Sequence, residues 1–355
     1  MFAKKTLVAA AALLAVAGAA QAQSSVKLYG YIEASVGSFE DFNFVDGTTD
    51  RATKVESGNM MTSFFGLSGS EDLGGGLKAE FVLEAFLAGD TGASVSNLAG
   101  IANNSGFFGR GSWVGLSGDF GRVALGQYDN AFFTMGLAYN PFGSSMTFSP
   151  SMVSYYSLGG FLAPSLGYDT GWVNSITYET PTIGGFSAAL QFAPKETSAG
   201  GDAKNNYAVS AAYNAGALSV MGVYTSSGDI NSAYFDRQKN WGLGASYDFG
   251  AAKLFAQYSV VKSETGGSDG KSKFFQIGAT VPVTEAGKVM VSYGQTKYDD
   301  FYVADGKLKQ FSLGYDHSLS KRSGVYAALT SKKLSDFGFE DETANTFAVG
   351  LRHAF

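Results

Sequence analysis

Residues 28–36 read LYGYIEASV, a stretch that alternates between apolar and polar side chains. Leu28, Ile32 and Val36 fall on one face of an extended chain, and Glu33 falls on the other. Because successive side chains of a β-strand point to opposite faces, this pattern predicts a strand that is apolar on one side only. The two faces of the resulting sheet must therefore meet different environments.

The same alternation recurs at 77–85 and again at 346–355, the C-terminus. Between such stretches, short turn signals alternate with longer polar segments. The turn signals lie at 71–75, 118–121, 182–185, 214–216, 248–250, 285–287 and 320–323, and the longer segments at 39–53, 89–105, 129–172, 195–204, 227–237, 263–271, 299–306 and 333–343. Short turns at one end and long loops at the other are typical of outer-membrane barrels, and this count predicts about 16 antiparallel strands.

The composition favours the same fold. Aromatic residues make up 14% of the chain, Gly counts 47 and Pro only 6. Strands favour Tyr and Phe, Gly permits tight turns, and Pro would break the hydrogen bonds of a sheet. The predicted fold class is therefore all-β, a transmembrane antiparallel β-barrel wide enough to enclose water.

The N-terminus predicts export. Lys4 and Lys5 precede an apolar run at 6–20 that is too short to span a bilayer as a helix, and the small residues Ala-Gln-Ala follow at 20–22. We expect a cleaved signal peptide at 1–22 and a single barrel domain at 23–355. The chain has no Cys, and without its two leader lysines it keeps 23 basic against 31 acidic residues, a balance that disfavours nucleic acid as a partner.

Four motifs carry a family resemblance. They are VKLYG at 26–30, GSEDLGGGLKA at 69–79, WVGLSGDFG at 113–121 and GLRHAF at 350–355. Over the whole precursor the chain resembles the general porins of the beta-proteobacterial and neisserial type. The resemblance implies a homotrimer, and a third loop that folds inward and narrows the pore by facing arginines on the wall.

The longest connection, 129–172, is the expected third loop. From Asn130 to Tyr168 it contains no charged residue but many aromatic ones. Two interpretations remain open: the rings could stack on solutes in a substrate-specific channel, or they could hold the loop against the wall. The aromatic residues concerned are Phe132, Phe133, Tyr139, Phe142, Phe148, Tyr155, Tyr156 and Phe161.

The chain departs from its relatives at the pore. Relatives tend to read Ser-Arg-Trp-Gly-Leu-Arg-Gly on the second strand, where this chain reads SFFGLSG at 63–69, and Leu-Gly-Arg-Gln where it reads LGQY at 125–128. Of the expected wall arginines, Arg110 persists, and Arg122 and Arg352 have suitable phases. Because carboxylates share these faces, we expect weak selectivity that leans to cations.

The predicted function is passive diffusion of small hydrophilic solutes and ions through the bacterial outer membrane. An enzyme is disfavoured, because the only histidines, His317 and His353, have no evident nucleophile and carboxylate beside them; an adhesin or structural barrel would conduct nothing. Expected partners are further copies of the chain, outer-membrane lipid and lipopolysaccharide, and the barrel-assembly machinery, with no cofactor, metal or nucleic acid. The candidate pore-lining residues are Glu33, Phe64, Ser68, Lys78, Glu80, Arg110, Arg122, Asp129, Phe132, Tyr139, Tyr155 and Arg352.

Phe355 ends the chain on the apolar face of the last predicted strand, in phase with Val349 and Leu351. Such a terminal aromatic residue resembles the signal that barrel-assembly machinery reads. Deleting Phe355 should therefore lower the amount of protein inserted in the outer membrane, measured by fractionation and by the yield of heat-resistant oligomer. Wild-type levels of inserted oligomer from the truncated chain would contradict this expectation.

Overall fold

The computed structural model describes residues 25–43, 48–95, 106–157, 170–195, 204–228, 236–265, 268–299, 305–337 and 340–355. The expected signal peptide at 1–22 lies outside these residues. Strands account for most of what is described, and they form one antiparallel sheet. None of the helices in the described part is long and apolar enough to cross a membrane.

The sheet closes on itself. The first strand, β1, pairs with the last, β18, along one edge and with β3 along the other. Of the 18 described strands, β2 pairs with β1 and β5 pairs with β4 in addition to the pairs that close the ring. The other 16 strands form the closed barrel. The strands are β1 (Ser25–Asn43), β2 (Thr48–Glu56), β3 (Phe64–Gly74), β4 (Leu77–Leu87), β5 (Ser94–Val95), β6 (Gly111–Gly118), β7 (Gly121–Asp129), β8 (Gly171–Glu179), β9 (Phe186–Ala193), β10 (Asn206–Ala215), β11 (Leu218–Gly228), β12 (Arg237–Asp248), β13 (Lys253–Thr265), β14 (Ser268–Pro282), β15 (Gly287–Asp299), β16 (Gly306–Ser318), β17 (Ser323–Ser335) and β18 (Glu342–Ala354).

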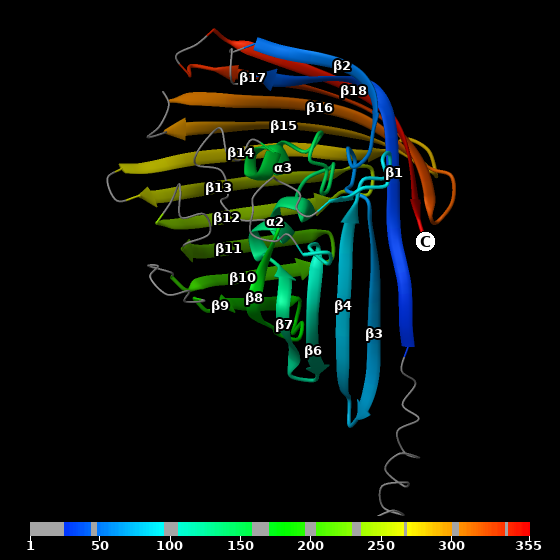
Figure 1. Cartoon of the computed structure of the whole chain (residues 1–355), viewed down its shortest axis with the longest axis vertical. Coiled ribbons are helices and arrows are strands. Elements are labelled where there is room, and N and C mark those ends of the chain that lie inside the picture. Colours follow the sequence, from blue (N-terminus) through cyan, green and yellow to red (C-terminus); the bar gives the residue numbers. More distant parts are fainter. Residues whose placement is uncertain are drawn as a thin grey trace, which may run out of the picture.

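The strands tilt around the ring. In Figure 1, β1, β3 and β4 cross the direction of β9 to β16 on the opposite wall, as tilted strands on two sides of a barrel must. The predicted alternation is confirmed: on β1, Leu28, Ile32 and Val36 are exposed on the outer face, whereas Glu33 is completely buried inside. The apolar face therefore points to lipid and the polar face to the interior.

All seven predicted turns are confirmed as short connections at one end of the barrel. The turn between β3 and β4 shows why glycine is needed there. Gly74, Gly75 and Gly76 have φ values of +85°, +61° and +81°, a region that side chains with a Cβ rarely adopt. The sequence Gly-Gly-Gly is thus a reversal of the chain.

Several predicted loops were wrong in extent. The segments 39–53, 263–271 and 333–343 were expected to be connections, yet β1 and β2 take up most of the first, β13 and β14 take up most of the second, and β17 continues to Ser335 in the third. Beyond the membrane both faces of a strand are polar, so the hydrophobic alternation that marks a strand disappears while its ladder hydrogen bonds continue. The hairpin of β1 and β2 arises in the same way.

The expected third loop, 129–172, also contains regular structure. It forms helix α2 (Ala131–Ala138), helix α3 (Pro150–Met152) and a π-helical turn at Val153–Ser157. Asn130 caps α2 by accepting a hydrogen bond from the Phe132 N–H. Both helices lie between the front and back walls in Figure 1.

Candidate functional site

Residues 130–156, hereafter the inner segment, pack against the inward-facing side chains of the barrel wall. Helix α2 lies over β11 and β12, where two glycines make room for it. A Cβ on Gly244 would lie 2.3 Å from the Tyr139 ring, and one on Gly242 would lie 2.4 Å from the Met135 methyl group. The absence of side chains at these two positions therefore allows close contact between helix and wall.

Hydrogen bonds fix the inner segment to polar residues of the wall. Gln257 donates to the Gly136 carbonyl (3.0 Å), and the Ser151 N–H donates to the Gln276 side chain (2.9 Å). Tyr155 bonds to Ser259 through their hydroxyls at 2.7 Å. Such contacts replace water for groups on both sides, so the segment is held without any charged residue.

The candidate aromatic residues of this segment face the wall. Phe132, Tyr139 and Tyr155 are 0%, 4% and 2% exposed. Phe132 packs edge-on against Tyr155, and the Tyr139 hydroxyl meets that of Ser219 at 2.9 Å. This packing favours the interpretation that the rings hold the segment in place. Phe161, also considered, lies outside the described residues.

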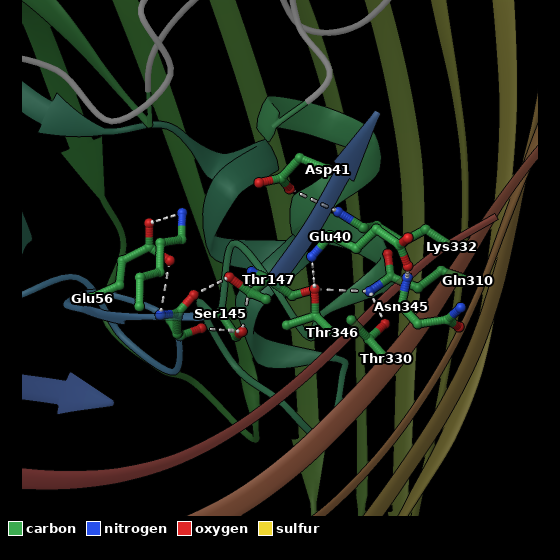
Figure 2. Close-up of polar contacts among 12 residues, drawn as sticks. Glu40, Asp41, Glu56, Ser145, Thr147, Gln310, Thr330, Lys332, Asn345 and Thr346 are labelled. Carbon is green, nitrogen blue, oxygen red and sulfur yellow. Dashed lines mark hydrogen bonds and ion pairs between the residues drawn. The ribbon is translucent and has the colours of Figure 1, made fainter. Parts of the chain in front are cut away.

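Residues 57–63, hereafter the latch, hold the middle of the inner segment at Ser145 and Thr147. The Asn59 carbonyl accepts a hydrogen bond from the Ser145 hydroxyl (2.6 Å), and its side-chain oxygen accepts one from Thr147 (2.7 Å). Figure 2 shows Ser145 and Thr147 with Glu56, which accepts from the Asn59 amide, and Gln310, which donates to the Thr147 carbonyl (3.0 Å). The latch thus joins β1 to β3 and the inner segment.

Glu33 anchors the latch. Its carboxylate is buried and accepts hydrogen bonds from the N–H groups of Gly58 and Asn59 and from the Tyr326 hydroxyl. Within the described chain it forms no ion pair, so backbone N–H dipoles supply the positive potential that it needs. Glu33 faces the interior of the barrel, where the latch covers it.

A cavity of about 580 Å³ remains open between α2 and the wall formed by β4 and β6 to β11. Charged side chains line it on the β4, β6 and β8 side, and Asp129 of β7 also lines it. Thr134 of α2 bounds it opposite. This is the part of the interior that the inner segment does not fill.

Arg110 is held in this cavity by Glu84 and Phe64. It pairs with Glu84 at 3.1 Å, and Glu84 in turn accepts a hydrogen bond from the Tyr29 hydroxyl at 2.6 Å. The guanidinium also lies 4.2 Å from the centre of the Phe64 ring, within the range of cation–π attraction. The Phe64 ring therefore helps to fix the position of the Arg110 side chain.

Arg122 is also neutralised. It pairs with Glu80 and with Glu179, each at 3.1 Å, and donates to the Tyr128 hydroxyl at 3.4 Å. Glu179 was absent from the candidates, although the inward phase of Ser175 and Thr177 on the same strand would have identified it. The two arginines beside the cavity are thus matched by three carboxylates.

The remaining candidates lie apart from this group. Ser68 is half-buried on β3, and Lys78 is exposed near the short-turn end of β4. Arg352 pairs with Asp316 at 2.6 Å on the wall of β16 and β18, away from the residues that line the cavity. The sequence did not identify Asp316 as an inward-facing residue, because it lies at the polar end of a strand, where the alternation of apolar and polar residues does not distinguish the two faces.

Comparisons with known proteins agree with this geometry. A family model described as Gram-negative porin matches residues 9–336. Outer membrane porin protein 32 of Delftia acidovorans is 36% identical over 305 residues, 82% of this chain and 79% of the relative. The solved anion-selective porin from Comamonas acidovorans is 32% identical with a TM-score of 0.77, covering 94% of this chain and 100% of that one.

A more distant solved structure, the trimer form of OmpT of Vibrio cholerae, is 14% identical with a TM-score of 0.66, covering 94% of this chain and 99% of that one. At this identity the likeness concerns the fold alone.

Replacing Glu33 by Gln should loosen the latch. An amide offers one acceptor oxygen and an NH₂ group that would face other donors, so part of the N–H cluster would lose its partner. We expect larger current fluctuations in the open state and closure at lower voltage, measured by single-channel recording. Glu71→Gln, at an exposed turn, is the matched control; a Glu33→Gln channel as quiet as that control would count against the latch.

Proposed function

The chain belongs to the Gram-negative porin family, and from this premise we propose that its channel is weakly selective with a preference for cations. Porins of this family are water-filled barrels of the outer membrane, and this 16-strand barrel is one of them. The proposal assigns the chain passive diffusion of small hydrophilic solutes and ions and no chemistry of its own.

The charge balance of the cavity carries this proposal. Arg110 and Arg122 are each paired with carboxylates, and Asp129 is a further carboxylate that lines the cavity. The inner segment contributes no charge of either sign. An ion that passes through the cavity therefore meets a weakly negative electrostatic potential, because the carboxylates outnumber the arginines.

The solved relative is described as an anion-selective porin. By the family resemblance, Phe64 and Ser68 of this chain take positions where relatives tend to carry arginine, and Glu179 adds to the pairing of Arg122. Fewer unpaired positive charges would remain to attract anions. We therefore propose that the two proteins share a fold and differ in the sign of their preference.

Removing the paired carboxylates should reverse this preference. A charge about 8 Å from an ion in water is worth roughly 0.5 kcal/mol, or about a twofold change in local ion concentration. Because the local cation concentration falls and the anion concentration rises by that factor, Glu84→Gln and Glu179→Gln should each shift the permeability ratio about fourfold toward anions, measured by reversal potential in a potassium chloride gradient. Glu71→Gln at the turn should leave it unchanged; a strong anion preference in the wild type would disprove the proposal.

We also propose that the protein is a homotrimer that associates through the face of β17, β18, β1, β3, β4, β6 and β7. Tyr and Trp gather at the lipid–water boundary of barrels. On the outer faces of the described strands they occur only from β8 to β16. They are Tyr178, Tyr207, Tyr213, Tyr224, Trp241, Tyr247, Tyr258, Tyr293 and Tyr315.

On the other half of the barrel the Tyr and Trp side chains point inward, as Trp113 and Tyr128 do beside the cavity. Its outer face carries aliphatic residues such as Val114 and Val36, together with Phe347. A wall without boundary Tyr or Trp fits contact with protein better than contact with lipid. The solved trimer form of a fold relative supports this state.

Placing a bulky residue on each face in turn distinguishes contact with a neighbouring subunit from contact with lipid. Val114→Trp, on the proposed contact face, should hinder close packing and lower the temperature at which the trimer dissociates. Leu243→Trp, on the aromatic-rich half, should leave it unchanged because lipid adapts to the larger ring. Thermal dissociation followed by semi-native electrophoresis measures both, and equal trimer stability in the two variants would place the contact elsewhere.

A further inference from the structure

The cavity beside α2 has a charged half and a neutral half. The charged half is lined by the carboxylates of Glu84, Asp129 and Glu179 and by the guanidinium of Arg110. The neutral half is lined by small side chains of β9 and β10 and by a methionine of β11. Among these residues are Ser187, Ala189, Ala208, Ser210, Ala212 and Met221.

The two halves of the cavity adjoin at β8. Glu179 of β8 lies directly opposite Ala189 of β9 in the antiparallel register, and Ala189 lies opposite Ser210 of β10. Two residues before Glu179, and therefore on the same inward face, Thr177 also lines the cavity. A solute at this place meets a carboxylate and a hydroxyl at one end and small, uncharged side chains at the other.

The hydroxyl of Thr177 is a polar group that the barrel wall does not satisfy. The residue is 3% exposed, and its hydroxyl has no hydrogen-bond partner within the described residues. Its polar neighbours are satisfied by each other, since Gln191 donates to the Tyr128 carbonyl (3.1 Å) and to the Ser175 hydroxyl (3.3 Å). Because a buried polar group without a partner is costly, a solute that bonds to this hydroxyl gains free energy.

Glu179 can accept a hydrogen bond from a solute as well. Its side chain is 36% exposed, and one of its oxygens accepts from Arg122 at 3.1 Å. A carboxylate has about four lone-pair sites, so a second donor can bind from the cavity. The charge of Arg122 does not exclude a cation here, because Glu80 pairs with the same guanidinium at 3.1 Å.

We propose that this cavity binds small organic ammonium ions, namely primary amines that carry a short apolar body. The N–H groups of the ammonium donate to Glu179 and Thr177, and the body lies over the small side chains of β9 and β10. This inference rests on the proposed cation preference and deepens it, because it names the class of cation that the cavity holds longest. A potassium ion has neither N–H groups nor an apolar body, so it gains from the charge alone.

The first test measures how strongly a series of solutes blocks the potassium current through single wild-type channels. Methylammonium, butylammonium and neutral butanol are added in turn, and the half-blocking concentration of each is determined. At about twofold for each additional CH₂ group that is partly buried, butylammonium should block at about an eightfold lower concentration than methylammonium. Equal half-blocking concentrations for the two amines would overturn the proposal, as would equal block by butanol and butylammonium.

Thr177→Val tests the hydrogen bond, because valine has nearly the shape of threonine but lacks its hydroxyl. The half-blocking concentration of butylammonium should rise about fivefold, whereas that of butyltrimethylammonium, which has no N–H group, should stay the same. Thr177→Ser should keep the wild-type block. The matched control is Thr280→Val, which lies on the inward face of β14 and does not line the cavity. Butylammonium block that is equal in Thr177→Val and in this control would contradict the assigned site.

The cation preference is measured separately, from the reversal potential of the same channels in potassium chloride without amine. A cation-preferring channel that fails the amine series contradicts this inference and leaves the proposed function standing. An anion-preferring channel contradicts the proposed function, whatever the amine series gives.

Discussion

The structure depends on one constraint, that no backbone N–H or C=O facing hydrocarbon can be left without a partner. The pairing of β1 with both β18 and β3 meets it by joining the two ends of the sheet. Closure has a second consequence, because every strand must then turn one face to lipid and the other to the interior. Binary alternation along the membrane-spanning parts of the strands follows from the closed ring and not from the preferences of single residues.

A ring of 16 strands is wider than its own side chains can fill, and this chain fills the excess unequally. The inner segment lines the side of β11 to β16 with buried aromatics and neutral hydrogen bonds. The charged residues stay on the opposite side, where Arg110 and Arg122 meet their carboxylates beside open space. Charge is thus kept where water can solvate it, since burying it under the inner segment would be costly.

Local patterns predicted what local geometry determines. The alternation at 28–36 and the glycines at 74–76 required only strand period and turn conformation, and both were confirmed. Strand ends beyond the membrane were mistaken for loops because both faces there are polar. The partnership of Phe64 with Arg110 and the anchoring of the latch by Glu33 join residues far apart in the chain, so no spacing in the sequence could reveal them.

The barrel is asymmetric inside, where the inner segment covers one wall, and outside, where Tyr and Trp occur on one half. Under the proposed trimer, both asymmetries have the same mechanical basis. The wall from β11 to β16 faces lipid, which resists little, and it is supported from within by the inner segment. The wall of β4, β6 and β7 would be supported from outside by a neighbouring subunit, which leaves its inner face free to line the passage. The open cavity adjoins this second wall. The wall that a neighbouring subunit would support from outside is then the wall that water contacts inside. The position of the channel therefore follows from the position of the subunit contact.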